Sequence, residues 1–280
     1  MRLCRPLVSG LLVVAACAKP APQAAGPNVV TITATDYAFG APDTIPAGLT
    51  TFRLVNQGRE PHHAVIAGAS GRSWEELETV MKTEGPIPAW LTFPAGPTVV
   101  VGGDSSNATG VFAPGNYLIM CFIQSPDGQM HVMKGMFRRL VVTAPAPAPA
   151  ASRAAAPAPE PQSDVTVTLS DYTFTLSAPL TAGPHTIRVE NNGPQLHEVT
   201  IEQLAPGKTL ADVRRWMATG MKGEPPTKPV GGFIGPDVGK TGWFTVTLTP
   251  GKYLLTCYVP DSKDGKPHLA HGMVKEITVS

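Results

Sequence analysis

Residues 30–66 read VTITATDYAFGAPDTIPAGLTTFRLVNQGREPHHAVI, and residues 165–201 read VTVTLSDYTFTLSAPLTAGPHTIRVENNGPQLHEVTI. The two stretches align without a gap, and matched residues are 135 positions apart throughout. After one insertion, APGNYLIMCF at 113–122 aligns with TPGKYLLTCY at 249–258. A repeat of this length is typical of tandem domains and not of solenoid units. The chain therefore contains two copies of one domain.

Within each copy, the hydrophobic pattern has mostly a period of two, which predicts half-buried strands separated by Gly and Pro turns. One helix interrupts this pattern in each copy, in SWEELETVMKT at 73–83 and TLADVRRWMAT at 209–219. Each helix opens with a capping box, formed by Ser73 with Glu76 and by Thr209 with Asp212. The sequence predicts an all-β fold of two tandem Greek-key β-sandwich domains, each with one short helix insertion.

Composition divides the chain into five segments. We expect the domains at residues 29–143 and 164–280, and a spacer at 18–28. The linker at 144–163 alternates Ala and Pro, which favours an extended polyproline II conformation that holds its ends apart. Such a linker would let the two domains reach separate partners.

Residues 1–17 read MRLCRPLVSGLLVVAAC, with two arginines, an apolar run and small residues before Cys17. The apolar run is short for a transmembrane helix and is typical of an export signal. The ending VAAC resembles a bacterial lipobox, which implies lipidation of Cys17; the alternative is an ordinary secretory signal. We expect a periplasmic or cell-surface protein held at the membrane through a lipid anchor only.

The charge balance excludes one class of partner. The chain has 22 basic and 21 acidic residues, a formal net charge of +1, and so has no electrostatic footprint for nucleic acid. Each copy holds one further cysteine, Cys121 or Cys257. A disulfide between the copies is one interpretation. The other is a metal, because an unpaired thiol in an oxidising compartment is reactive unless something occupies it.

Each copy places two histidines, a cysteine and a methionine in the same order. Two imidazoles, a thiolate and a weak axial thioether are the ligands of a blue-copper site. The candidate copper ligands are His62, Cys121, His131 and Met136 in the first copy, and His197, Cys257, His268 and Met273 in the second. His63 and His271 are alternatives to a histidine of these sets. The alternative is that these residues have no role in metal binding: the thiols and thioethers pack in the core, and the histidines lie on the surface.

The context of these residues resembles the cupredoxin family. The stretches NQGREPHHAVI and NNGPQLHEVTI carry the first histidine after an N-x-G turn, and HVMKGM and HLAHGM end the ligand loop. The long ligand loop is similar to that of the type 1 site in copper nitrite reductase. The resemblance implies type 1 copper cycling between Cu(I) and Cu(II). This chain departs from the family where an asparagine commonly follows the first histidine, because His63 and Glu198 stand there.

The number of histidines limits which members of the family this chain can resemble in activity. Multicopper oxidases and nitrite reductase need further histidines for a second class of copper, and this chain has seven histidines and no His-x-His pair. We therefore expect no enzyme. The leading hypothesis is a monomeric, envelope-anchored protein that binds one copper per domain and transfers single electrons to redox protein partners, or carries copper. The alternatives are a copper-free binding or scaffold module and a protein that sequesters copper without redox turnover.

Overall fold

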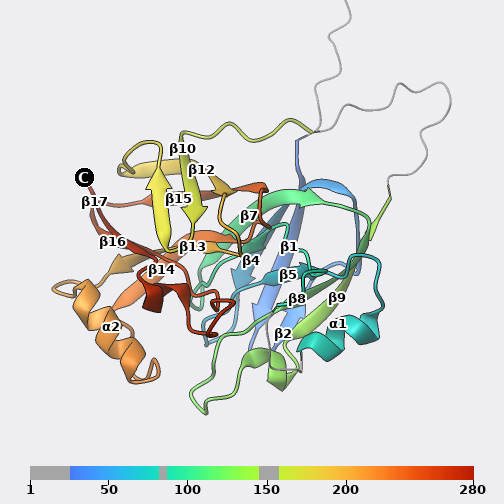
Figure 1. The fold of residues 1–280 in the computed structure, drawn as a ribbon, viewed down its shortest axis with the longest axis horizontal. Helices are drawn as coiled ribbons and strands as arrows, with labels where there is room; N and C mark the ends of the chain where they lie inside the picture. Colours follow the sequence, from blue (N-terminus) through green and yellow to red (C-terminus); the bar gives the residue numbers. More distant parts are fainter. Residues whose placement is uncertain (1–25, 82–86, 145–157) are drawn as a thin grey trace, which may run out of the picture.

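The computed structural model describes residues 26–81, 87–144 and 158–280 (Figure 1). The predicted signal segment and Cys17, the predicted site of lipidation, lie outside these residues. No helix in the described ranges combines the length and apolar character that a bilayer span requires.

The first copy folds into two facing sheets, one with the order β2-β1-β4-β7 and the other with the order β3-β9-β8-β5. Its strands are β1 (Asn28–Thr35), β2 (Ala38–Gly40), β3 (Thr44–Pro46), β4 (Gly48–Asn56), β5 (Val65–Gly68), β6 (Gly96–Pro97), β7 (Ser105–Phe112), β8 (Gly115–Met120) and β9 (Phe137–Thr143).

The second copy repeats this arrangement, with the order β11-β10-β12-β15 in one sheet and β17-β16-β13-β14 in the other. Its strands are β10 (Val165–Ser170), β11 (Thr173–Leu176), β12 (Gly183–Asn191), β13 (Glu198–Leu204), β14 (Thr227–Ile234), β15 (Thr241–Leu248), β16 (Gly251–Thr256) and β17 (Val274–Val279). The predicted pair of β-sandwiches is confirmed.

The alternation of buried and exposed residues along the strands explains why the two sheets pack face to face. Val30, Ile32 and Ala34 of β1 are buried, and the residues between them face outward. Successive side chains of a strand point to opposite faces, so one face joins the core and the other meets water. Burying one such aliphatic side chain contributes roughly 1.5–3 kcal/mol.

The two predicted helices are present as α1 (Trp74–Met81) and α2 (Leu210–Ala218), and they lie at opposite ends of the molecule (Figure 1). Ser73 N–H donates to Glu76 Oε2 at 3.0 Å, and Glu76 N–H donates to Ser73 Oγ at 3.2 Å. In the second helix, Thr209 N–H donates to Asp212 Oδ2 at 2.9 Å. The predicted capping boxes therefore begin both helices.

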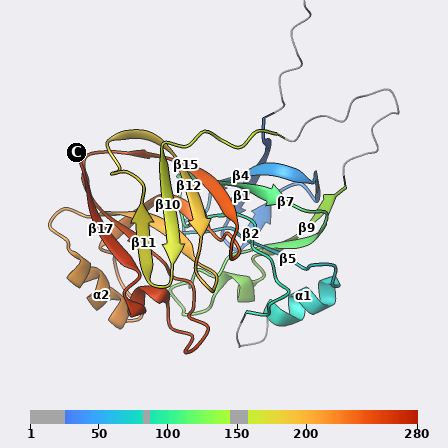
Figure 2. The same cartoon turned by 45° about the horizontal axis from the view of Figure 1, so that its top comes forward.

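Within the described residues the two copies pack together through shared strand pairing, and the expectation that they reach separate partners stays a prediction. Strand β15 pairs with β7, which joins four strands of each copy into one sheet with the order β11-β10-β12-β15-β7-β4-β1-β2 (Figure 2). Strand β6 of the first copy pairs with β14 of the second. The hydrophobic core is also continuous, since one cluster of buried residues contains side chains of both copies.

The contact between the copies has approximate two-fold symmetry. Pro97 pairs with Phe233, and these two positions correspond in the repeat, as Cys121 and Cys257 do, being 136 residues apart. The pairing of Thr109 with Trp243 is likewise centred on two corresponding positions, 108 and 244. The same surface patch of each copy therefore meets its counterpart, as in an isologous dimer.

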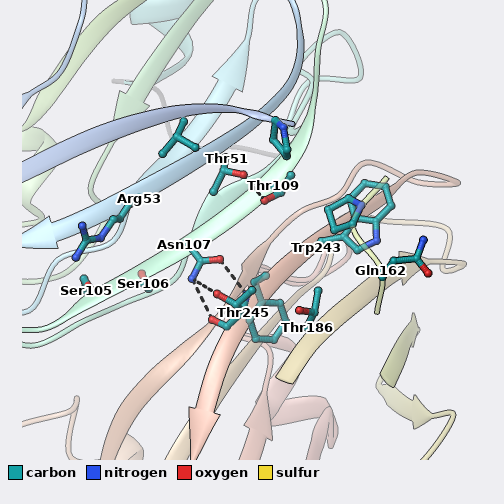
Figure 3. Close-up of a pocket in the computed structure, with 14 residues that line it drawn as sticks. Thr51, Arg53, Ser105, Ser106, Asn107, Thr109, Gln162, Thr186, Trp243 and Thr245 are labelled. Carbon is teal, nitrogen blue, oxygen red and sulfur yellow. Dashed lines mark hydrogen bonds between the residues drawn. The ribbon is translucent and has the colours of Figure 1, made fainter. Parts of the chain in front are cut away.

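Side chains extend this pairing beyond the strands. The amide of Asn107 donates to Thr245 O at 3.0 Å, and Thr245 N–H donates to Asn107 Oδ1 at 2.9 Å (Figure 3). Asp237 makes a similar pair of hydrogen bonds, accepting from Phe93 N–H at 2.8 Å and donating its own N–H to Phe93 O at 3.1 Å. These bonds hold the two sandwiches in one fixed orientation.

Candidate metal centres

Backbone hydrogen bonds bring the predicted ligands of the first copy together. His62 lies before β5 in a two-residue bridge with Val100, with N···O distances of 3.0 and 2.9 Å. Cys121 follows β8, and His131 begins the 3₁₀ helix η1 (His131–Lys134). Cys121 N–H donates to Met136 O at 3.2 Å, and Met136 N–H donates to His131 O at 2.9 Å. The loop therefore folds back so that three of the four predicted ligands start from adjacent backbone positions.

The donor atoms of the first copy converge in a buried site, which we call centre 1. His62 Nδ1 lies 3.1 Å from His131 Nδ1, and Cys121 Sγ lies 3.9 and 3.4 Å from these two atoms. Metal–nitrogen bonds of about 2.0–2.1 Å and a metal–sulfur bond of about 2.3 Å place such donors roughly 3–4 Å apart. The side chains of all three residues are buried. The donor set and its spacing fit one metal ion.

The second copy reproduces this arrangement in centre 2. His197 Nδ1 lies 3.0 Å from His268 Nδ1, and Cys257 Sγ lies 3.4 Å from His268 Nδ1. The three donor atoms all lie within 4.8 Å of one another. His268 begins the 3₁₀ helix η2 (His268–His271), as His131 begins η1.

The predicted axial methionines, Met136 and Met273, each follow a glycine that ends a 3₁₀ helix in the left-handed region, with φ of 93° and 98°. Both methionine side chains are fully buried in the cluster that contains Cys121 and Cys257. Their burial in the same core cluster as the cysteines is compatible with weak thioether ligation.

The protonation states of the donors suit metal binding. Burial, and then the neighbouring His131, lower the pKa of His62 to about 4, and burial lowers the pKa of His268 to about 4 as well. These imidazoles therefore keep a free lone pair at neutral pH. Burial raises the pKa of the Cys121 thiol to about 11 and raises that of Cys257 further. A bound metal would therefore displace a proton from each thiol.

Carboxylates fix the tautomers of the ligand histidines. Glu60 Oε2 lies 2.9 Å from His131 Nε2, and Asp171 Oδ1 lies 3.0 Å from His197 Nε2. A carboxylate at Nε2 holds the proton there and leaves the Nδ1 lone pair facing the centre, as in other metal sites. The other two histidines have looser carboxylates, with Asp36 at 3.7 Å from His62 Nε2 and Asp261 at 3.6 Å from His268 Nε2.

Sequence reasoning missed these carboxylates, although the repeat carries a partial signal. Asp36-Tyr37 and Asp171-Tyr172 correspond in the alignment. Tyr37 OH donates to Glu60 Oε1 at 2.7 Å, and Tyr172 OH donates to Asp261 Oδ2 at 2.6 Å. The repeated Asp-Tyr pair could have marked a shared role, but the partners Glu60 and Asp261 occupy different positions in the repeat and could not be matched by alignment.

The alternative ligands lie outside both centres. His63 Nε2 accepts a hydrogen bond from Phe122 N–H at 2.8 Å, and His271 Nε2 lies 3.1 Å from Asp264 Oδ1. Cys121 and Cys257 are free thiols, so the interpretation of a disulfide between the copies is wrong.

The residue after the first histidine has the same contact in both copies. Glu198 Oε1 accepts from Tyr258 N–H at 2.9 Å, as His63 accepts from Phe122 N–H, and Glu198 N–H donates to Cys257 Sγ at 3.4 Å. Burial raises the pKa of Glu198 to about 7, and desolvation lowers the pKa of His63 to about 3. In both copies, the side chain after the first histidine accepts a hydrogen bond from the residue after the cysteine and so supports that segment, whether the acceptor is an imidazole or a carboxyl group.

No family model matches the chain, and no curated protein matches it in sequence. Among solved structures, auracyanin A from Chloroflexus aurantiacus, described as a "blue" copper protein, is 22% identical over 42% of this chain and 100% of its own, with a TM-score of 0.32. A reduced auracyanin from Roseiflexus castenholzii is 19% identical over 42% of this chain and 99% of its own, with a TM-score of 0.30.

A third similar structure matches across both copies. The Cu-containing nitrite reductase of Thermus scotoductus SA-01 is 12% identical over 90% of this chain and 61% of its own, with a TM-score of 0.24.

The expectations that the resemblance carried for the fold and the donor clusters are confirmed: the chain forms two β-sandwiches, and each holds a His/Cys/His group. The domain boundaries, the identity of the ligands and the expectation of no enzyme stay predictions.

Proposed function

We propose that each copy binds one type 1 copper ion and that the chain transfers single electrons, or carries copper, at the cell envelope. The convergence of two imidazole nitrogens and one thiol sulfur, in both copies and at spacings that suit one ion, supports this proposal. Copper held by these donors supplies one-electron exchange between Cu(I) and Cu(II), since thiolate favours the first state and imidazole is compatible with both.

The protein residues would keep the donor geometry constant during this exchange. In centre 1, the bonds of Cys121, His131 and Met136 to one another's backbone hold their side chains in place. The carboxylate of Glu60 fixes the ring of His131. A donor set that does not rearrange suits electron transfer, and we propose Met136 and Met273 as the weak axial ligands of the two centres.

The role at the envelope is also a proposal. We propose export of the chain, lipidation of Cys17 and electron exchange between a monomer and redox protein partners, without conversion of a substrate. Incorporation of a labelled fatty acid, together with recovery in the membrane fraction, tests the anchor. Cys17→Ser should lose the label and move to the soluble fraction, whereas equal labelling of both forms would contradict lipidation.

Metal analysis and visible absorption of the purified full chain test the copper proposal. We expect one thiolate-bound copper ion in each copy and an intense thiolate-to-copper band. Cys121→Ser and Cys257→Ser should each remove about half of both signals, and the double variant should remove the band, because a seryl oxygen is a poor substitute for the soft thiolate.

A colourless chain that takes up no stoichiometric copper, with Cys121 open to alkylation, would contradict the proposal. A cellular phenotype that survives both cysteine substitutions would favour the copper-free binding module. Slow reduction by a small electron donor, with copper fully bound, would favour sequestration over electron transfer.

A further inference from the structure

A third group of donor side chains lies outside centre 2, on the loop between β16 and β17. Asp261, Asp264 and His271 each offer a donor atom, and these atoms all lie within 4.8 Å of one another. His271 Nε2 lies 3.1 Å from Asp264 Oδ1. In a tetrahedral site with bonds of about 2.0–2.2 Å, ligand atoms lie roughly 3.3–3.6 Å apart. Small side-chain rotations would bring the three donors to that spacing.

The first copy has a lysine ammonium group at the corresponding place. Lys134 corresponds to His271, and Asp127 corresponds to Asp264 in the repeated Asp-Gly of the loop. The ammonium of Lys134 lies 2.7 Å from Asp127 Oδ2 and donates to Tyr37 OH at 3.2 Å. The fold therefore accommodates a positive charge between this loop and the tyrosine.

The second copy changes the chemistry of that place. Lysine gives way to histidine, which offers a metal a lone pair where the ammonium has none. Ser125 of the first copy gives way to Asp261, which adds a carboxylate. The second copy thus lacks the ammonium that Lys134 supplies at this place and gains two metal-ligand groups, Asp261 and His271. Imidazole and carboxylate together suit Zn²⁺ and Cu²⁺.

Asp261 is the rigid member of the group. Its side chain is buried, and its Oδ2 accepts from Tyr172 OH at 2.6 Å and from Gln195 Nε2 at 3.1 Å. Its Oδ1 accepts from Lys263 N–H at 2.8 Å. A carboxylate has about four lone-pair positions, so Oδ1 retains one for a cation.

Asp264 and His271 are the adjustable members, with side chains 35% and 30% exposed. The ammonium of Lys266 lies 3.3 Å from Asp264 Oδ2, but this lysine side chain is 69% exposed and can turn into water when a cation arrives. An exposed pair of this kind contributes little stability and is readily exchanged.

The group also adjoins a buried nitrogen that lacks a partner. His268 is fully buried, and its Nε2 makes no hydrogen bond within the described ranges. The nearest carboxylate oxygen is Asp261 Oδ2 at 3.6 Å. Asp261 therefore lies between the inner histidine and the outer donors.

We propose that Asp261, Asp264 and His271 form a second kind of metal site that binds one divalent cation of the Zn²⁺ or Cu²⁺ class, with water completing the coordination. This site is separate from the two thiol-containing centres, and the first copy lacks it. The inference does not depend on the proposed electron transfer.

Titration of the full chain with Zn²⁺, followed by calorimetry, tests this site against a matched variant. His271→Lys installs the residue that the first copy has at this position, and it should preserve the fold because the new ammonium can pair with Asp264. Since both proteins contain the same inner centres, the difference between them isolates the outer site. We expect the native chain to bind one more Zn²⁺ ion than His271→Lys, and Asp264→Asn to bind that ion on the order of tenfold or more weakly.

The reciprocal change supplies an independent readout. Ser125→Asp combined with Lys134→His builds the same three donors around Asp127 in the first copy, and this variant should gain one Zn²⁺ ion. Circular dichroism checks that each variant is folded. Equal Zn²⁺ binding by the native chain, His271→Lys and Asp264→Asn would overturn the site, as would the absence of any gain in the double variant. Loss of copper binding at the inner centres would leave the difference between native chain and His271→Lys intact, so the two proposals fail separately.

Discussion

The two copies hold the same donor set but surround it with different charges. Phe122 N–H donates to the imidazole of His63 in the first copy, and Tyr258 N–H donates to the carboxyl of Glu198 in the second. The second copy adds Glu202, which accepts from Tyr258 OH at 3.1 Å and whose pKa burial raises to about 7. The backbone that positions the donors is thus retained, whereas the electrostatic surroundings differ between the copies.

The carboxylates next to the histidines show a related exchange. Glu60 of the first copy corresponds to Gln195, and Ser125 corresponds to Asp261. Each copy therefore has one carboxylate between its tyrosine and its second histidine. In the first copy it comes from the segment before the first ligand histidine, and in the second copy it comes from the loop after the cysteine. The requirement is for a negative charge at this place, and either backbone segment can provide it.

The largest effect is expected from Glu198→Gln in the metal-free chain. Burial raises the pKa of Glu198 from 4.5 to about 7, so its contribution to stability is full below pH 4.5 and is lost as the pH rises through 7. Glutamine still accepts from Tyr258 N–H and has no charge to bury. Relative to the native chain, the variant should gain about 3 kcal/mol in the free energy of unfolding between pH 4 and pH 8.

Denaturant unfolding at both pH values measures this gain. The matched control is Glu224→Gln, because Glu224 is exposed and its substitution should leave the pH dependence unchanged. An identical pH dependence for Glu198→Gln and the native chain would show that Glu198 stays ionised in the folded state.

The next largest effect is the loss of copper affinity when a carboxylate near a ligand histidine is replaced. The more important carboxylate should come from a different repeat position in each copy. In the first copy, Glu60→Gln should weaken copper binding more than Asp36→Asn, because their distances to a histidine Nε2 are 2.9 and 3.7 Å. In the second copy, Asp171→Asn, at 3.0 Å, should have the larger effect than Asp261→Asn, at 3.6 Å. Loss of such a partner typically costs about 10–100-fold in metal affinity.

Competition titration with a copper chelator measures these affinities. Combining Glu60→Gln with Ser125→Asp reproduces the pair of residues found in the second copy and should recover part of the lost affinity, because the equivalent Asp261 lies at the longer distance of 3.6 Å from its histidine. If Ser125→Asp brings no recovery, the two copies do not use equivalent carboxylates.

A smaller effect is expected at the contact between the copies. Asn107→Ala removes two hydrogen bonds to the backbone of Thr245, at a cost of about 1–2 kcal/mol in the free energy of unfolding. We expect the native chain to unfold in a single transition, and because these bonds join the copies, the transition of the variant should broaden toward two. Asn192→Ala, at an exposed position, is the control. An unchanged transition would mean that strand pairing alone joins the copies.

The smallest effect is expected from His63→Gln, which should act on pH dependence with the opposite sign to Glu198→Gln. Desolvation lowers the pKa of His63 from 6.5 to about 3, so the native metal-free chain loses stability as the pH falls below 6.5. The variant should lose less between pH 7 and pH 5. The effect is limited because His63 is only partly buried. Thermal unfolding at the two pH values measures it, and a steeper loss in the variant would contradict the assignment.

Much of the fold and of the donor clusters could be predicted from the sequence because the signals are local or repeated. Alternation in β1 and the Ser73 capping box depend on residues close in the chain. The donor sets could be recognised because copper chemistry demands particular residue types, and the same order recurs in both copies. Neither inference needed the distance between remote residues.

The contact between the copies and the carboxylates at the histidines could not be predicted in this way. Asn107 resembles any polar residue on the outer face of a strand, and its role appears only when β15 lies beside β7. Glu60 and Asp261 resemble solvated loop acids, and only the folded chain brings each close to a histidine Nε2.

The sequence by itself determined the repeated strands, the helix starts and the kinds of donor atom, since these follow from side-chain periodicity and ligand chemistry within short segments. The tertiary structure alone decided that the two sandwiches share one sheet. It alone also decided that residues from different repeat positions place a carboxylate near the second ligand histidine of each copy. The physical reason is that electrostatic interactions and strand pairing depend on distances in space, which two copies can satisfy with residues from different points along the chain.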